Sequence, residues 1–437
     1  MQTTSLNNIV KLTHPPVCKG AAIFVLFGVT AVFAQLVRGA SICNDPARTV
    51  VTQSFGPITP HQGPRLLVNP LNANGTSALT VLSMGDSAMW GNGLDKEHKY
   101  SHMVARHLAE VTQRSVTLIV YAHSGANLST EAGQSYEPMR PSDNGVPPGD
   151  PNAGLPTVLQ QEACAKKDYS QAEIILLDGC INDVSALAIG LPFPFSGATP
   201  DAIRRRANLQ CSEPVKTLLR NVKDDFPKAT IILSNYWLII SDKSSPAGVT
   251  VEKGIIRATS ADPVLNKEYE NLLYAQRKAE QETGQNFAAA DLLSDPAHIF
   301  RKWSDNSQAF LVTSQDCFVS AIATVNGQSV DKPCSHLDPA MAQRVTQDLR
   351  VFLATVSVEP QYSYGAGPLK RVWSVPIGRH RQDQEYDRRR VVCDTHYPIG
   401  GKRFICQINP TAHPNVDGAK AFTDSMNSVL DVAWKVQ

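Results

Sequence analysis

Short apolar runs alternate with amphipathic segments over most of the chain. The apolar runs predict strands at 79–84, 116–121, 174–177, 230–238 and 287–292. Helical spacing of apolar positions predicts helices at 102–112, 157–165, 212–226, 266–283, 339–356 and 416–434. Strands that alternate with helices favour a mainly parallel sheet with helices on both faces. Ligands of such sheets bind at the carboxyl ends of the strands, so functional residues are expected there.

The predicted α/β domain covers residues 78–437. It follows a lead-in at 41–77, which is rich in Pro, Gly and Asn from residue 44 onward and is expected to be irregular. An insertion at about 357–408 is expected to contain a hairpin. Together with the long loops expected at 133–154 and 189–209, this insertion is expected to shape a pocket.

Residues 1–40 have the character of a targeting segment. Lys11 and Lys19 precede an apolar stretch at 21–37, and Val32-Phe33-Ala34 offers small residues for a signal peptidase. This pattern predicts an export signal and a secreted or periplasmic protein. The alternative is an uncleaved helix that anchors the protein in a membrane, because the stretch is near the lower length limit for spanning a bilayer.

The cysteines agree with export. Nine are present, and Cys18 lies in the N-terminal segment. The other eight form an even set, as expected in an oxidising compartment, and no His/Cys spacing matches a zinc site. Plausible local disulfides are Cys180–Cys211, Cys317–Cys334 and Cys393–Cys406.

Composition and net charge limit the classes of partner that the sequence supports. The chain has 437 residues, 42% of them hydrophobic, which is enough for a large core. The net charge of +1 gives no electrostatic case for a nucleic-acid partner. Acidic residues interrupt the Arg-rich stretch 379–390, which we therefore interpret as a solvated loop.

Polar motifs follow the predicted strands. Gly85-Asp86-Ser87 comes after the first strand, and Gly125 lies in the segment after the second. Gly179 to Asp183 follows the third strand, and His413-Pro414-Asn415 precedes the last helix. Strand ends of a parallel sheet meet at one edge, so these motifs are expected to converge.

The converging residues suit acyl transfer by a serine. This chemistry needs a nucleophile, a base, and donors for the oxyanion. Ser87 is the candidate nucleophile and His413 the candidate base. The candidate oxyanion donors are the N–H groups of Ser87 and Gly125 and the side-chain amide of Asn182, which is neutral at any working pH.

These residues, in this order, resemble the SGNH (GDSL-type) hydrolase family. The resemblance spans roughly residues 79–430 and rests on the four motifs together. It implies a flavodoxin-like three-layer α/β/α sandwich and a serine hydrolase or acyltransferase that acts on esters without a metal or other cofactor. The Gly-x-Ser-x-Gly elbow of the α/β-hydrolases is absent from the sequence.

The sequence departs from the family pattern at two points. The family often has an aspartate three residues before the base histidine, where this chain has Pro410, with Asn409 one residue further back. We therefore expect a backbone carbonyl, or an acid from elsewhere in the chain, to orient His413. The third motif is one residue longer than the family's Gly-x-Asn, and a disulfide at Cys180 would fix that loop.

Alternatives for individual roles remain open. Asp295 to His298 and Ser335-His336 could supply the base in place of His413. His123 could line the site, although a packed or solvated histidine is the plainer interpretation. Asp86 is expected to orient its turn through hydrogen bonds to nearby N–H groups.

The sequence thus predicts an exported serine esterase or lipase that hydrolyses carboxylic esters through an acyl-enzyme. One alternative is acyl transfer to a carbohydrate or lipid acceptor at the same site. Another is a non-catalytic binding protein on this scaffold. The expected partner is an ester or lipid substrate, with possible contact to a membrane or lipid surface, and the pattern does not determine the oligomeric state.

Overall fold

The computed structural model describes part of the chain in detail. The described residues are 43, 50–57, 67–68, 77–129, 156–185, 189, 199–238, 249–252, 255–258, 296–330, 334, 351–354, 391, 393–395, 413–414, 416–433 and 435–436. The chain divides into two units, Met1–Asp45 and Pro46–Gln437. All of the helices and strands discussed below belong to the second unit.

A six-stranded sheet forms the centre of the second unit, in the order β1-β4-β3-β5-β6-β9. Its strands are β1 (Val51–Phe55), β3 (Leu79–Met84), β4 (Val116–Val120), β5 (Ile174–Leu177), β6 (Thr230–Ser234) and β9 (Val351–Ala354). All neighbours pair in parallel except β1, which runs antiparallel to β4 at one edge. The five parallel strands have the flavodoxin-like order 2-1-3-4-5. The predicted fold class is confirmed.

The central strands are apolar along their whole length because helices cover both faces of the sheet. Every residue of β5 and β6 is buried, and so is every residue of β3 except Thr80. Such strands have near-continuous hydrophobic runs rather than alternating ones. This is why 79–84 and 174–177 were recognisable in the sequence with their observed bounds.

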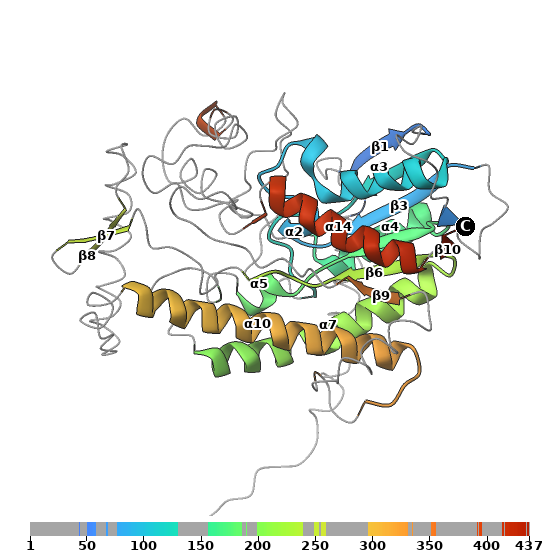
Figure 1. Ribbon diagram of the computed structural model, residues 1–437. Coiled ribbons are helices and arrows are strands. Elements are labelled where there is room, and N and C mark those ends of the chain that lie inside the picture. The colour runs from blue at the N-terminus through green and yellow to red at the C-terminus, as the bar shows by residue number, and fades with distance from the viewer. Residues whose placement is uncertain are drawn as a thin grey trace, which may run out of the picture. The chain divides into compact units, whose positions relative to one another are not determined.

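Helices cover the two faces as separate layers (Figure 1). One layer consists of α3 (Tyr100–Thr112) and α14 (Val416–Ala433), which pack on each other. The other contains α4 (Val158–Tyr169), α7 (Pro200–Asp225) and α10 (Pro296–Val325), with α10 running along α7. Phe422 of α14 packs on Tyr100 of α3, with ring centroids 4.4 Å apart.

The order of the strands places a topological switch point between β3 and β5. After β3 the chain turns to β4 on one side, and after β4 it crosses to β5 on the other side. The carboxyl ends of these strands and β6 lie level in the sheet. Their last pairs are Ser83 with Val120, Met84 with Leu177, and Leu177 with Leu233. Segments that follow these ends are therefore brought together, in the place where doubly wound sheets bind ligands.

Several predicted elements differ from the structure. The lead-in at 41–77 contains β1 and a short strand β2 (Leu67–Val68), which pairs with β10 (Lys435–Val436). The sequence of β1, Val-Thr-Gln-Ser-Phe, has few apolar residues because an edge strand is only half-covered. The predicted strand at 230–238 ends at Ser234.

The predicted helix at 339–356 is wrong in its last part, where β9 adds a fifth parallel strand beside β6. A short apolar run such as Val-Phe-Leu-Ala fits a buried strand as well as a helix. The spacing of its apolar residues therefore could not distinguish the two structures. The expected loop at 189–209 was too long, because α7 begins at Pro200, where Thr199 caps the helix.

Helix α10 was not predicted. The predicted elements at 266–283 and 287–292 lie outside the described residues, as does nearly all of the insertion at 357–408. The predicted export signal at 1–40 also lies outside them. Among the helices that the structure describes, none has the length and hydropathy to cross a membrane. A described hairpin pairs β7 (Val249–Glu252) with β8 (Ile255–Ala258).

Candidate active site

The turn after β3 presents Ser87 at the start of a short helix, α2 (Ser87–Trp90). Asp86 is the N-cap of this helix and accepts a hydrogen bond from Ala88 N at 2.9 Å, as expected from the sequence. Ser87 is the first helical residue, so its own N–H is one of the donors that a helix cannot satisfy internally. Ser87 is 7% exposed. The turn therefore offers a hydroxyl and a backbone donor at one point.

His413 lies next to Ser87. The distance from Ser87 Oγ to His413 Nε2 is 2.6 Å, although the two residues are 326 positions apart in the sequence. In the tautomer with its proton on Nδ1, the imidazole accepts a hydrogen bond from the serine hydroxyl through Nε2. His413 directly precedes α14, which packs on the face of the sheet that holds α3. The final helix thus carries the histidine to the end of the first parallel strand.

Two other histidines, His298 and His336, were candidates for the base. His298 lies in the first turn of α10, and His336 lies outside the described residues. Pro410 and Asn409 also lie outside them. His123 is buried, its Nδ1 is 3.1 Å from the Ser124 carbonyl, and burial lowers its pKa to about 4.

The loop after β5 carries Asn182 within another short helix, α5 (Ile181–Val184). Asn182 Nδ2 donates to the carbonyl of Ala126 at 3.0 Å. The Nδ2 atom of an asparagine carries two hydrogens. Among the described residues, the Ala126 carbonyl is the one acceptor for them.

Gly125 and Asn182 lie on segments that are bonded to each other. Asp183 accepts from the backbone N–H of Leu128 at 2.9 Å, and Asn182 bonds to Ala126. Gly125 has a positive φ of 74°, which favours glycine at this position. The structure thus joins the segment after β4 to the segment after β5, as the convergence of strand ends predicts.

Buried carboxyl groups lie beneath the serine. Asp178 accepts from Asp86 N at 2.7 Å, and both side chains are almost fully buried. Burial raises the pKa of Asp86 to about 6, against lowering by hydrogen bonds from Tyr236 and Ala88. Burial also raises the pKa of Asp178 well above its ordinary value, and the charge of Asp86 raises it further. These groups hold the serine turn through its backbone.

Gly85 has no room for a side chain. A Cβ at this position would lie 1.9 Å from Asp178 Oδ1 and 2.7 Å from the Cβ of Met89. Gln161 of α4 bonds to both backbone groups of Gly85: its Oε1 accepts from Gly85 N at 2.8 Å, and its Nε2 donates to Gly85 O at 2.9 Å. The close approach of Asp178 and Gln161 explains why the motif begins with glycine.

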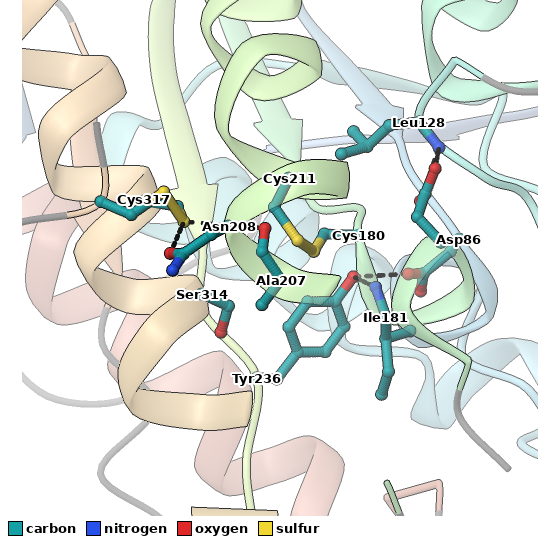
Figure 2. Close-up of a disulfide and its surroundings, with 12 residues drawn as sticks. Asp86, Leu128, Cys180, Ile181, Ala207, Asn208, Cys211, Tyr236, Ser314 and Cys317 are labelled. Atoms are coloured by element: carbon teal, nitrogen blue, oxygen red, sulfur yellow. Dashed lines mark hydrogen bonds between the residues drawn. A yellow bond between two sulfur atoms is a disulfide. The ribbon is translucent and has the colours of Figure 1, made fainter. Parts of the chain in front are cut away.

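A disulfide lies directly beside the loop that carries Asn182. Cys180, the N-cap residue of α5, is bonded to Cys211 of α7 (Figure 2). Cys317 of α10 is bonded to Cys334. These two predicted pairs are confirmed. Cys393 is also disulfide-bonded, as are Cys43 and Cys164, whereas Cys406 lies outside the described residues. Several disulfides in one chain are typical of an oxidising compartment.

Three residues around the serine turn were not singled out in the sequence: Gln161, Asp178 and Tyr236. The Tyr236 hydroxyl donates to Asp86 Oδ2 at 2.5 Å and accepts from Ile181 N at 3.3 Å. Asp178 directly follows the predicted strand at 174–177, and Tyr236 could have been found by the same question of which polar residues follow each strand, because it comes two positions after β6. Gln161 carried no such signal, because it lies inside an ordinary helix.

In the described part of the chain, no group of three or more His, Cys, Asp or Glu side chains could hold a metal ion. The arrangement that is present consists of a serine whose own backbone N–H lies at the start of a helix, and a histidine within hydrogen-bond distance of its hydroxyl. These are the components of nucleophilic catalysis at a carbonyl.

Two solved structures resemble part of this chain at low sequence identity. No protein-family model matches it, and no curated protein matches its sequence. One similar solved structure is a carbohydrate esterase family 2 enzyme with a carbohydrate-binding domain from Corynascus thermopiles (Myceliophthora fergusii), at 16% identity and a TM-score of 0.22. That match covers 38% of this chain and 47% of the enzyme.

Another solved structure matches at 16% identity and a TM-score of 0.21, covering 36% of this chain and 57% of the other. The chain thus spans about half the length of these structures. Likeness of this extent carries no argument about function, which has to be built from the site itself.

Proposed function

We propose that this protein is a serine esterase of the SGNH type, with Ser87 as nucleophile and His413 as base. The observation that carries the proposal is the 2.6 Å distance between Ser87 Oγ and His413 Nε2 at the switch point of a doubly wound sheet. A nucleophile and base in hydrogen-bond contact are the diagnostic pair of acyl-transfer enzymes.

The reaction would take place in two halves. In the first, Ser87 Oγ forms a bond to the ester carbonyl carbon while its proton passes to His413 Nε2. The carbon–oxygen bond to the alcohol then breaks, and His413 returns the proton to the leaving alkoxide. In the second half, His413 removes a proton from water, the hydroxide oxygen attacks the acyl-enzyme, and Ser87 leaves with its proton restored.

Three groups would stabilise the oxyanion in both halves. The Ser87 N–H lies at the start of α2, where the helix dipole also favours negative charge. Gly125 N–H and the second hydrogen of Asn182 Nδ2 would complete the set. Removal of one such donor costs on the order of a hundredfold in turnover.

The test compares two serines that each lie beside a histidine. Ser87→Ala should abolish hydrolysis of p-nitrophenyl acetate and labelling by a fluorophosphonate probe in a folded protein. Ser101→Ala is the matched control, because Ser101 Oγ lies 3.4 Å from His102 Nδ1 and is fully buried within α3. Wild-type-like hydrolysis by Ser87→Ala would refute the assignment.

The same experiment can be extended to the substrate. An acyl-chain-length series, with and without phospholipid vesicles, would separate an esterase from a lipase that works at a lipid surface. Transfer to a carbohydrate or lipid acceptor would use the same acyl-enzyme and would appear as acceptor-dependent turnover above hydrolysis. A wild-type protein without labelling or hydrolysis at any chain length would instead favour a binding protein.

We also propose that the protein is exported. The support is the apolar stretch at 21–37 behind Lys11 and Lys19, together with the disulfides. Expression of the full chain with an N-terminal sequencing step on the secreted product would test it. A product that stays in the cytoplasm with free thiols would contradict the proposal.

A further inference from the structure

Tyr236 lies at the carboxyl end of β6 and is held there on all sides. The side chain is 1% exposed. Its ring packs against Phe310 of α10, with centroids 5.3 Å apart, and against Trp237 at 6.1 Å. Its backbone N–H donates to Asn235 Oδ1 at 2.8 Å. The ring that carries the phenol oxygen is therefore held in place by its neighbours on the strand segment and on α10.

The phenol oxygen bonds to two separate parts of the site. It donates to Asp86 Oδ2 at 2.5 Å and accepts from Ile181 N at 3.3 Å (Figure 2). Asp86 directly precedes Ser87, and Ile181 directly precedes Asn182. One hydroxyl group thus contacts the neighbour of the proposed nucleophile and the neighbour of a proposed oxyanion donor.

The geometry makes this contact strong on the Asp86 side. A hydrogen bond to a carboxylate is shorter and roughly twice as strong as one between neutral groups. Asp86 is fully buried, and a low local dielectric strengthens the bond further. The other oxygen of the same carboxylate, Asp86 Oδ1, caps α2 by accepting from Ala88 N. Asp86 therefore links the Tyr236 hydroxyl to the helix that begins at Ser87.

We infer that Tyr236 is a positioning residue that sets the spacing between the Ser87 turn and the Asn182 loop. The inference rests on the proposed function and adds to it a residue that no motif contains. Ser87 must face the carbonyl carbon while Asn182 faces the oxygen, so their spacing has to match the transition state. A misplacement of about 1 Å in such a constellation can cost roughly a hundredfold in rate.

The ionisation of Asp86 supplies an independent readout. The hydrogen bond from Tyr236 lowers the pKa of Asp86 and partly offsets the effect of burial. The other titratable groups that interact with Asp86 are Asp178, Asp183 and Tyr100. All three remain in a Tyr236→Phe variant, so the pKa of Asp86 should rise there. Protonated Asp86 would lose its charge-assisted cap, and turnover should fall at a higher pH than in the wild type.

The test is Tyr236→Phe, which removes one oxygen and keeps the packed ring. We expect kcat for p-nitrophenyl acetate to fall about tenfold to a hundredfold with KM nearly unchanged, and the acid limb of kcat to move to higher pH. Tyr121→Phe is the control, because Tyr121 is also buried but its ring lies edge-on to Tyr169, 6.2 Å away. Unchanged kcat in Tyr236→Phe, or an equal loss in the control, would overturn the inference.

Hydrogen exchange separates this inference from the proposed function. If Ser87→Ala behaves as proposed and Tyr236→Phe keeps wild-type kcat, only the positioning role fails. If the wild-type protein is inactive, the proposed function fails. Exchange of the peptide that contains Ile181 then still tests the coupling. It should be faster in Tyr236→Phe than in wild type, because the amide loses its acceptor, and an unchanged rate would overturn the inference.

Discussion

The disulfide beside the Asn182 loop allows stability and catalysis to be separated. The perturbation is the double variant Cys180→Ala/Cys211→Ala, which removes the bond between the Asn182 loop and α7. The matched control is Cys317→Ala/Cys334→Ala. Each pair joins a buried helical cysteine, Cys211 or Cys317, to a cysteine with positive φ outside that helix. Cys317 and Cys334 lie outside the segments that carry Ser87, Asn182 and His413.

The two losses of stability should be similar. The pairs are 31 and 17 residues apart in the sequence. Loop-closure entropy of the unfolded chain then assigns about 3.7 kcal/mol to the first pair and about 3.1 kcal/mol to the second. Urea unfolding followed by tryptophan fluorescence measures both values, and the difference between them should be small.

The effects on catalysis should differ sharply. Without its tether, the Cys180 segment can shift Asn182 away from the oxyanion, so we expect kcat to fall about tenfold or more in Cys180→Ala/Cys211→Ala. The control should keep kcat within about twofold, since it removes no bond to the Asn182 loop. Both are assayed with p-nitrophenyl acetate well below the unfolding transition. Equal kcat in the two variants would refute the reasoning, because the bond would then contribute stability alone.

Two further predictions concern packing and pH. Gly85→Ala places a Cβ 1.9 Å from Asp178 Oδ1, so it should lower the free energy of unfolding by about 3 kcal/mol; a wild-type urea midpoint would contradict the clash. Burial, with the neighbouring Asp225, raises the pKa of Glu162 from 4.5 to about 8, so the folded state binds this proton more tightly than the unfolded state. The contribution of Glu162 to stability therefore falls as pH rises from about 4.5 to about 8, and Glu162→Gln should flatten that part of the profile of melting temperature against pH; parallel profiles would count against it.

Much of the fold was readable because its signals are local. The strands at 79–84 and 174–177 are uninterrupted apolar runs, since both faces of the sheet are covered there. The final helix was recognisable from its apolar spacing, and it buries Phe422, Met426 and Leu430 on one side. By contrast, β9 was mistaken for helix, because four apolar residues fit either structure until a neighbouring strand is known.

In the candidate site, too, some residues could be predicted from local sequence and others could not. Ser87 and His413 could be proposed from the sequence because each lies in a short motif at a predicted strand end or helix start. Their 2.6 Å separation depends on the packing of α14 against α3, which no local pattern contains. Gln161 and Tyr236 were missed because their partners, Gly85 and Asp86, are 76 and 150 residues away.

The sequence by itself therefore determined the central strands, the doubly wound class and the residue types available for chemistry, because periodicity and turn composition act over a few residues. Only the tertiary structure decided which polar groups meet. Hydrogen bonds between distant segments depend on the register of β3, β4, β5 and β6, which brings their ends level. That register turns separate motifs into one site, with Tyr236 between the serine turn and the Asn182 loop.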